Sequence, residues 1–405
     1  MPQSPKAVQL HVHVSGKDRP GILAEAMESI RRFGLEVLDI KQFVFNGLLN
    51  LSLLLDGNPT ISLTAFKKEL QGYAKKSGMQ VNIYPWDASF RPDATYKYRS
   101  VVTLLGQAIS FMALQELMKT FAALDINVLR IEQLDYGDRH VMEFVIGTRK
   151  SHSTVEVLNP LVEFKKDYNV DIAVQEDTVF RRNKRLIVLD ADMTFVQCEV
   201  IDELGKMAGV GEQLSAITHR AMNGEIEFEE ALRERVSLLK GLEVERLVEF
   251  ANCIPMTPGA EGLVRILKYL GYKVAIVSGG FQLFIDSLKN KYGLDYGFAN
   301  CLEVVDGKLT GGLVGEIIGP SAKERILESL AKREKMTLKQ VVAVGDGAND
   351  IPMLAKAGLG IAFNAKPIVQ QAAHASINMR DLGLILYFLG ISGDELKELD
   401  RLSSA

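Results

Sequence analysis

The chain has 405 residues, of which 24% are charged and 47% hydrophobic, an ordinary globular composition with room for two or three domains. Its formal net charge of -4 gives no electrostatic reason to expect binding to nucleic acid or to an anionic membrane, and we find neither an apolar N-terminal signal nor an apolar run of about 18 residues. Three widely separated cysteines indicate neither a disulfide framework nor a zinc site, so we expect a cytoplasmic protein.

Residues 1–85 predict the element order β-α-β-β-α-β. Val8–Val14 alternates with period two, as a strand does, and Pro20 stands where a helix often begins. The helical pattern that follows ends at Gly34, and Asn46-Gly47 is a strong hairpin signal. A second helix and a last strand complete the set, at Leu63–Lys76 and Val81–Tyr84.

The same order returns in residues 99–178, after a polar, proline-containing stretch at residues 86–98 that we interpret as a linker. Equivalent positions are offset by about 90 residues, which indicates an internal repeat. Within the second copy, the apolar pattern predicts one helix over Thr154–Tyr168.

Each copy resembles an ACT domain, a ferredoxin-like module that binds amino acids in regulated metabolic enzymes. The first copy carries Asp18-Arg19-Pro20-Gly21, similar to the ACT turn in which an effector carboxylate meets backbone amides at a helix N-terminus. The resemblance implies effector binding at Asp18 and Gly21, and by position at Gly106, although the second copy lacks the rest of the motif. A tight turn that opens an ordinary helix is the structural alternative.

From Arg181 onward, strands alternate with longer helices, which is typical of a parallel α/β sheet. We therefore expect a third domain over residues 181–405, with a helical cap inserted after its first strand at about residues 201–254. The charged tail, Asp394–Ala405, is expected to be a frayed helix end. The candidate sheet strands are Leu186–Asp190, Lys273–Ser278, Val341–Gly345 and Gly358–Phe363.

Two of these strands end in carboxylates. Asp190 and Asp192 follow the first, and Asp346 and Asp350 follow the third. If the strands are neighbours, Asp190, Asp192 and Asp346 converge at the carboxyl edge of the sheet, where open α/β sheets bind ligands. Such an oxygen-rich site suits Mg²⁺, with Asp350 orienting the ligands from behind. A surface Asp-x-Asp turn is the alternative for the first pair taken alone.

Two further features suit a phosphate group. Ser278 and Gly279 end the second strand, where a hydroxyl and closely approaching backbone amides can bind phosphate oxygens, and Lys323 can supply a compact cation. Taken singly, most Ser-Gly-Gly turns bind no ligand, and most lysines are solvated on the surface. Chance rarely supplies them together with two acid-tipped strands in this order.

Residues Arg181–Leu389 resemble the haloacid dehalogenase superfamily of phosphohydrolases. The resemblance implies that Asp190 is the nucleophile that forms an aspartyl-phosphate and that Asp192 is the general acid/base. It also implies Mg²⁺ bound by Asp190, Asp346 and the backbone carbonyl of Asp192. The phosphoryl oxygens would be bound by Ser278, Gly279, Lys323 and Asn349.

The cap region resembles the phosphoserine phosphatase family in the order and spacing of Glu199, Met222, Phe228 and Arg235. Glu199 would bind the substrate ammonium and Arg235 its carboxylate, while Met222 and Phe228 would close the pocket against water. One departure is Met193, which stands where the family usually has Ser. We expect it to tune the rate without abolishing activity.

The implied reaction is hydrolysis of O-phospho-L-serine to L-serine and phosphate, the last step of serine biosynthesis. The implied assembly is a homodimer in which L-serine acts as an effector of the ACT-like copies. Two alternatives stay open: a phosphatase of the same superfamily for another small phosphate ester, and a non-catalytic amino-acid sensor. The sensor is the weaker alternative because the residues that carry the phosphatase chemistry are all present, namely Asp190, Asp192, Ser278, Lys323, Asp346, Asn349 and Asp350.

Overall fold

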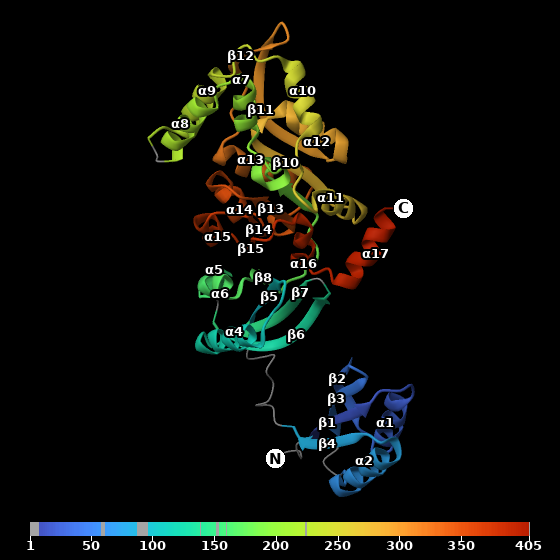
Figure 1. The fold of residues 1–405 in the computed structure, drawn as a ribbon. Coiled ribbons are helices and arrows are strands. Elements are labelled where there is room, and N and C mark those ends of the chain that lie inside the picture. Colours follow the sequence, from blue (N-terminus) through green and yellow to red (C-terminus); the bar gives the residue numbers. More distant parts are fainter. Residues whose placement is uncertain are drawn as a thin grey trace. The chain divides into compact units, whose positions relative to one another are not determined.

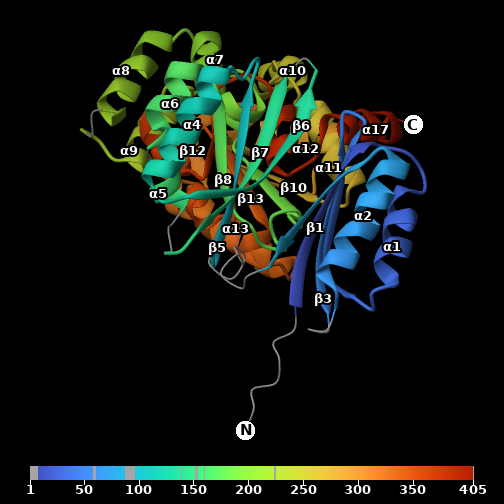
Figure 2. The same cartoon turned by 90° about the horizontal axis from the view of Figure 1, so that it is seen from below.

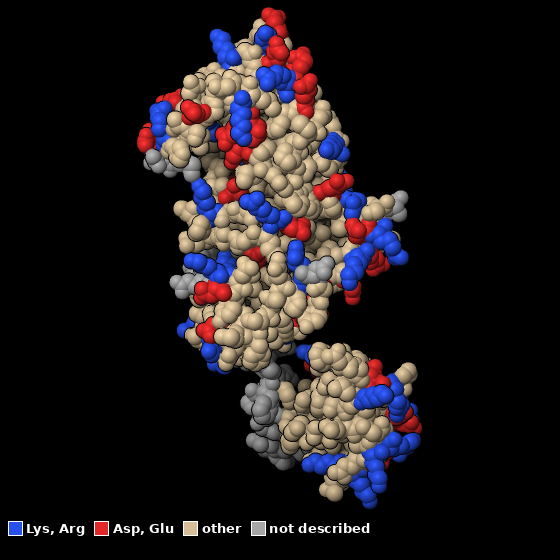
Figure 3. All heavy atoms as spheres, in the orientation of Figure 1, with Lys and Arg blue, Asp and Glu red and all other residues tan. Residues whose placement is uncertain are grey.

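The structure is a computed structural model that describes residues 8–57, 61–86, 96–137, 139–150, 154–158, 160–222 and 225–404. The chain divides into two compact units, Met1–Thr95 and Tyr96–Ala405, and each is described by itself (Figure 1). None of the helices within the described ranges has the length and hydrophobicity of a membrane span. Acidic and basic side chains are interspersed over the face shown in Figure 3, as the small net charge predicts.

The N-terminal unit is a four-stranded antiparallel sheet in the order β2-β3-β1-β4, with both helices on one face (Figure 2). The predicted hairpin is confirmed, because Asn46 and Gly47 both have positive φ, of 48° and 76°, as a type I′ turn requires. Leu51 and Phe66 are among the fully buried core residues. The elements are β1 (Val8–Lys17), α1 (Ile22–Arg31), β2 (Glu36–Phe45), β3 (Leu48–Gly57), α2 (Leu63–Ser77) and β4 (Gln80–Pro85).

The second unit begins with the same order of elements, in a sheet ordered β8-β5-β7-β6. The prediction of one helix over Thr154–Tyr168 is wrong: the helix is divided into α5 and α6, with Pro160 at the start of α6. Proline lacks the N–H that a continuous helix needs at this position. The elements are β5 (Tyr98–Gly106), α4 (Phe111–Ala123), β6 (Asn127–Tyr136), β7 (His140–Thr148), α5 (Thr154–Leu158), α6 (Leu161–Tyr168) and β8 (Asp171–Glu176).

The predicted parallel α/β sheet follows, and its central strand β9 lies between β10 and β13. Alternate residues of these strands enter two separate hydrophobic clusters, Ile187 in one and Val188 in the other, so both faces of the sheet are covered by helices. The strands are β9 (Leu186–Leu189), β10 (Lys273–Phe281), β13 (Val341–Gly345), β14 (Leu359–Phe363) and β15 (Ala375–Ile377). The covering helices include α11 (Ala260–Tyr269), α12 (Gln282–Tyr292), α13 (Pro320–Arg333) and α14 (Ile351–Lys356).

The second repeat and the α/β domain share one continuous sheet of eleven strands. Ala173 of β8 pairs with Ala375 of β15 in antiparallel register, and the amide of Val174 donates to the carbonyl oxygen of His374 at 3.0 Å. A side chain adds to this pairing, because Gln175 Nε2 donates to the backbone carbonyl oxygen of Phe388 at 2.7 Å. Main-chain and side-chain bonds therefore both hold the second repeat to the α/β domain.

The cap consists of four helices between β9 and α11, which are α7 (Val200–Ala208), α8 (Gly211–Met222), α9 (Phe228–Ser237) and α10 (Val244–Cys253). A hairpin of β11 (Tyr296–Val305) and β12 (Lys308–Val314), which we did not predict, supports it. The Gly241 amide donates to Leu309, and a Cβ at Gly311 would lie 3.0 Å from the Ser237 carbonyl oxygen. The hairpin thus packs closely against the end of α9.

The expected frayed end is instead a regular helix, α17 (Gly393–Ser403). Ser392 and Glu395 form a capping box at its start, and Asp400 forms an ion pair with Arg265 of α11. These two contacts fix the start and the last turn of the helix. The proposed linker falls largely on residues 87–95, which lie outside the described ranges, so the predicted domain boundaries stay predictions.

Candidate active site

The loop after β9 places the first two carboxylates at the carboxyl edge of the sheet. The chain makes a single wide turn over Ala191–Phe195, closed by a bond of 2.9 Å from the Val196 amide to the Ala191 carbonyl oxygen. Asp190 is 4% exposed, and its Oδ1 accepts the Ala191 amide at 2.8 Å. Met193 adopts a left-handed conformation with φ of 55°, and its side chain is exposed.

The loop after β13 brings two more carboxylates to the same place, because β13 pairs in parallel with β9. Carboxylate oxygens of Asp190, Asp346 and Asp350 lie within 4.8 Å of one another. Gly345 makes this approach possible, since a Cβ there would lie 2.4 Å from Asp350 Oδ2. That same oxygen accepts the Gly347 amide at 3.1 Å, so the backbone fixes the orientation of Asp350.

Lys323 of α13 neutralises part of this charge. Its Nζ donates to Asp190 Oδ1 at 2.8 Å and to Asp350 Oδ1 at 2.7 Å, and the lysine side chain is fully buried. Burial alone would lower the pKa of Lys323, but the Asp190 and Asp350 carboxylates raise it above its usual range. Lys323 is therefore a permanent cation between the two acid-tipped loops.

The irregular last part of β10, from Ser278 to Phe281, turns toward the Asp192 side chain. Ser278 is 1% exposed, and its Oγ accepts the Gly280 amide at 2.8 Å. A Cβ at Gly280 would lie 3.0 Å from Asp192 Oδ2, so this glycine lets the turn approach the carboxylate. Asn300 anchors the turn by donating to the Gly279 carbonyl oxygen at 2.8 Å, while its own side-chain oxygen accepts the Ile318 amide at 2.8 Å.

A cavity of about 170 Å³ lies between the sheet edge and the cap. Arg235 of α9 lies on its wall, where its Nε donates to the Ala231 carbonyl oxygen at 3.3 Å. The Phe228 ring lies against the turn, because a Cβ at Gly279 would be 3.5 Å from it. The cavity is lined by Asp190, Asp192, Glu199, Ile201, Phe228, Leu232, Arg235, Gly279, Gly280, Phe281, Asp346, Gly347 and Asn349.

The crowding of carboxylates disfavours their ionised forms. Burial, then Asp350, raises the pKa of Asp190 well above its usual range, although Lys323 opposes this. Burial and a neighbouring carboxylate also raise the pKa of Asp192 to about 8 and that of Asp346 to about 7. Glu199 is exposed as a residue, but removal of its carboxylate from water into the cavity raises its pKa too.

A further cation would relieve this repulsion. The donor set of Asp190, Asp346 and Asp350 is made of carboxylate oxygens alone, which suits a hard divalent ion. The side chain of Asp192 is not a member of this group. The binding of metal through its backbone carbonyl, and the placement of Asp350 behind the ligands, stay predictions.

The other predicted site residues lie in three places. Asn349 and Gly279 line the cavity, whereas Ser278 and Lys323 lie just behind its wall. Met222 is the last residue of α8, and its side chain lies outside the part of the chain that is described.

The predicted effector residues lie in the ferredoxin-like repeats. Gly21, with φ of 94°, precedes α1, and the Asp18 amide donates to the Gly47 carbonyl oxygen at 2.8 Å. Gly106 ends β5, where a Cβ would lie 3.1 Å from the Val170 side chain. The turns exist as expected, and effector binding at them stays a prediction.

Several residues of the site were missed. Ile201 and Leu232 supply apolar cap surface, and nothing in the sequence separates them from ordinary helix-core residues. Gly347 could have been found, since it follows an acid-tipped strand where a backbone has to approach closely. Thr194 is fully buried, and the described residues offer its hydroxyl no hydrogen-bond partner.

Two family comparisons match this architecture. Residues 184–358 match the haloacid dehalogenase-like hydrolases, and residues 9–84 match the ACT domain. A probable phosphoserine phosphatase from Vibrio cholerae, solved in its unliganded form, is 36% identical with a TM-score of 0.58, covering 74% of this chain and 88% of that one. A HAD-family hydrolase from Salmonella enterica serovar Typhi is 28% identical with a TM-score of 0.62, covering 72% and 98%.

Two relatives extend the match over almost the whole chain, both repeats included. The phosphoserine phosphatase of Streptomyces coelicolor is 37% identical over 394 residues, which cover 97% of this chain and 95% of that protein. The phosphoserine phosphatase SerB2 of Mycobacterium tuberculosis is 35% identical over 400 residues, which cover 98% and 96%. With the fold, the acid-tipped strands and the capped cavity, this likeness shows that the chain belongs to the phosphoserine phosphatase family, within the haloacid dehalogenase-like hydrolases.

Proposed function

We propose that this protein hydrolyses O-phospho-L-serine to L-serine and phosphate, and that Asp190 becomes phosphorylated during the reaction. The observation that carries the proposal is the buried contact of Lys323 with Asp190 beside Asp346 and Asp350, below a cap that presents Glu199 and Arg235. The cavity is small, with carboxylates at the sheet edge and with Glu199 and Arg235 at the cap. This lining fits an amino-acid phosphate ester, which carries a phosphate, an ammonium and a carboxylate group.

The nucleophile in this scheme is a carboxylate oxygen of Asp190. It attacks phosphorus, the bond from phosphorus to the serine oxygen breaks, and Asp192 donates its proton to that oxygen to release L-serine. Asp192 then takes a proton from a water molecule, and the resulting hydroxide attacks the aspartyl-phosphate. Phosphate leaves, Asp190 is regenerated, and Asp192 holds a proton again.

Mg²⁺ is the metal we propose for the carboxylate cluster, held by Asp190 and Asp346 and by the Asp192 backbone carbonyl. When bound, it supplies positive charge that offsets the negative charge of the phosphoryl group and of its aspartate neighbours. Lys323 binds a phosphoryl oxygen from the other side, orients Asp190 and favours the ionised form of its carboxylate. Ser278, Gly279 and Asn349 complete the set of donors to the phosphoryl oxygens.

The cap residues select the amino-acid part of the substrate. Glu199 binds the ammonium and Arg235 the carboxylate. Burial disfavours the ionised form of each side chain, and the attraction between the two opposite charges opposes that effect on both pKa values. Phe228, which already packs against Gly279, excludes water from the reacting atoms, and Met222 is assigned the same role.

Phosphate release from O-phospho-L-serine tests the reaction. We expect release in the presence of Mg²⁺, loss of release when EDTA removes the metal, and loss with Asp190→Asn. If the wild type released phosphate from another phosphate ester but not from phosphoserine, that ester would be the better candidate substrate. If no phosphate were released from any ester tested, the result would favour the amino-acid sensor.

The pocket assignment has its own test. Glu199→Gln and Arg235→Ala should lower kcat/KM for phosphoserine by about 100-fold each, if each removes about 3 kcal/mol of charge-assisted binding. Hydrolysis of a simple aryl phosphate, which lacks both charged groups, should change little. An equal fall for both substrates would contradict the assignment.

For regulation, we propose that L-serine binds at the Asp18–Gly21 turn and biases the phosphatase domain. A cytoplasmic homodimer is the assembly that we propose with it. The support is the match of residues 9–84 to the ACT domain and the backbone turn that opens α1.

A further inference from the structure

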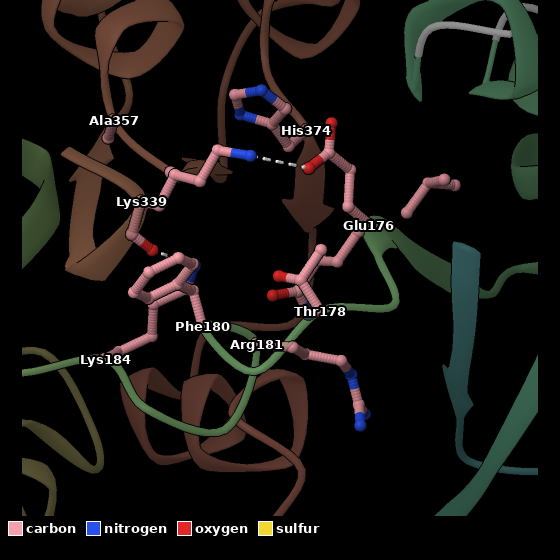
Figure 4. Close-up of a pocket in the computed structure, with 11 residues that line it drawn as sticks. Glu176, Thr178, Phe180, Arg181, Lys184, Lys339, Ala357 and His374 are labelled. Carbon is pink, nitrogen blue, oxygen red and sulfur yellow. Dashed lines mark hydrogen bonds and ion pairs between the residues drawn. The ribbon is translucent and has the colours of Figure 1, made fainter. Parts of the chain in front are cut away.

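A second cavity, of about 160 Å³, lies at the edge of the parallel sheet opposite Asp190 (Figure 4). Lining residues stand one or two positions before neighbouring strands of the sheet: Lys184 before β9, Lys339 before β13, Gly358 before β14 and His374 before β15. The amino ends of parallel strands meet at one edge of a sheet, so these residues converge there.

The opposite wall comes from the second ferredoxin-like repeat. Gln175 and Glu176 end β8, and the segment that follows, which includes Thr178 and Phe180, connects that repeat to β9. The cavity therefore lies at the junction of the two domains within the second unit.

Lys184 is the most informative residue on this lining. It is 3% exposed, and its Nζ donates to the Lys339 carbonyl oxygen at 2.6 Å. This bond uses one of the three ammonium hydrogens, and no acidic side chain forms an ion pair with Lys184 in the described part of the chain. Burial lowers the pKa of Lys184 to about 8, and the more distant charge of Glu176, which forms no ion pair with this lysine, opposes the shift only in part.

Two other side chains add donors. His374 Nδ1 accepts the Gly360 amide at 3.0 Å, so the neutral ring carries its hydrogen on Nε2. The Thr178 hydroxyl also belongs to the lining, and Figure 4 shows Thr178, Lys184 and His374 around the same open space.

The remaining charges on the lining are already paired. Glu176, the acidic residue of the lining, forms an ion pair of 3.1 Å with Lys339. Arg181 turns its side chain away from the open centre of Figure 4 and forms an ion pair with Glu143 of β7. The net result is a small polar cavity with one buried cation, Lys184, that forms no ion pair among the described residues.

We propose that this cavity is a binding site for a small oxyanion, a phosphate or a carboxylate group, that is held by the Lys184 ammonium and the Nε2–H of His374. A water molecule occupies about 30 Å³, so the cavity has room for an ion of this size. Bound there, the ion bridges the starts of β9 and β15 and lies against the segment that joins the second repeat to the phosphatase sheet. Its binding stabilises that junction, because only the folded state forms the site.

Equilibrium dialysis of the full-length protein against radioactive inorganic phosphate tests the site. EDTA is present, so that the metal-free carboxylate cluster of the active site repels phosphate. We expect the wild type to bind phosphate and Lys184→Met to bind one ion fewer per chain, while Lys332→Met, which removes an exposed lysine of α13, behaves as the wild type. Equal binding by the wild type and Lys184→Met would overturn the proposal.

A second variant tests the site in case Lys184→Met does not fold. His374→Asn keeps an acceptor near Nδ1 for the Gly360 amide and removes the Nε2–H, so it should fold and bind phosphate more weakly, by about tenfold for a lost hydrogen bond. Unchanged binding by His374→Asn would contradict the assigned donor. Displacement of the label by acetate would assign the site to carboxylates as well, and resistance would assign it to phosphate. If chloride at the same ionic strength displaced the label as well as acetate does, the binding would be unspecific and the proposal would be wrong.

Dialysis does not depend on turnover, so its outcome is separate from that of the proposed reaction. Lys184→Met should also release phosphate from phosphoserine at the wild-type rate when no free phosphate is added.

Discussion

Lys323 Nζ lies 2.8 Å from Asp190 Oδ1, and both side chains are buried at the edge of the sheet where two acid-tipped strands meet. A buried ion pair of this kind is costly to break on one side, because the remaining charge has no water to solvate it. The contact therefore contributes both to stability and to the proposed chemistry, because Lys323 orients the proposed nucleophile and reduces the repulsion between the carboxylates.

Replacement of Lys323 by Met should abolish phosphate release and also destabilise the fold, by about 3–5 kcal/mol, because Asp190 and Asp350 lose their shared cation. Urea unfolding and an activity assay measure the two effects. The exposed neighbour Lys332→Met is the control and should change neither. An active Lys323→Met protein would disprove the role assigned to this lysine.

Gly280→Ala should lower kcat by about tenfold or more, since the new Cβ would lie 3.0 Å from Asp192 Oδ2 and the carboxylate would have to move from the position in which we propose that it donates a proton. Gly262→Ala in α11, where a Cβ meets nothing within 4 Å, is the matched control. Steady-state kinetics compare the two. A Gly280→Ala enzyme with the kcat of the wild type would show that Asp192 is placed differently during the reaction.

The ion pair between Arg181 and Glu143 spans the connection of the second repeat to the phosphatase sheet, with exposed fractions of 5% and 1%. Arg181→Met should cost about 3–5 kcal/mol of unfolding free energy, because it leaves a buried, unpaired carboxylate. Adding Glu143→Met to that variant should restore much of the loss. A double-mutant cycle from urea unfolding, with Arg182→Met as an exposed control, would refute the pair if the two effects were simply additive.

The lowered pKa of Lys184 predicts a specific pH dependence. In the unfolded chain this lysine keeps its proton up to a pH of about 10.5, whereas in the folded protein it loses it near pH 8. Between these values the unfolded state binds more protons, so this group makes folding more favourable as pH rises, by about 3 kcal/mol across the window.

Lys184→Met removes that slope. Relative to the wild type, the variant should therefore be most stable below pH 8 and should lose this advantage toward pH 10. Thermal or urea unfolding of both proteins in a phosphate-free buffer measures the difference. A difference in stability that is independent of pH would show that Lys184 is not an uncompensated buried cation.

If L-serine acts through the first repeat, Asp18→Ala should weaken inhibition by L-serine while leaving kcat unchanged in its absence. The exposed helix residue Glu28 serves as the control, replaced by Ala. Initial rates at a fixed phosphoserine concentration over a range of L-serine concentrations give the answer. Identical inhibition of both variants and the wild type would place L-serine at the active site as a competitor instead.

Local sequence signals predicted much of the fold. The Asn-Gly turn, the alternating strands and the apolar runs ending in Asp190 and Asp346 each depend on neighbouring residues, which a sequence displays directly. Some signals of the same kind were overlooked. Pro160 divides the predicted helix, Ser392 and Glu395 cap α17, and the turn of the missed hairpin is Asp306-Gly307, both with positive φ.

Other features are out of reach of local patterns. The pairing of Ala173 with Ala375 joins strands about two hundred residues apart along the chain, and a single such pair leaves no mark in either segment. The same holds for the cavity beside Lys184, which forms only when four strand starts and a connecting segment come together. The apolar lining of the active site, such as Leu232, also depends on the orientation of the cap over the sheet.

The most direct test of the account is to trap the phosphorylated enzyme. Protein incubated with Mg²⁺ and O-phospho-L-serine labelled in its phosphate is quenched with acid during turnover and digested, and the labelled peptide is identified. The account predicts label on the peptide that contains Asp190, lost on treatment with base or hydroxylamine as an acyl phosphate is, and absent from Asp190→Asn. Rapid turnover with no trapped label, or label that persists in Asp190→Asn, would contradict it.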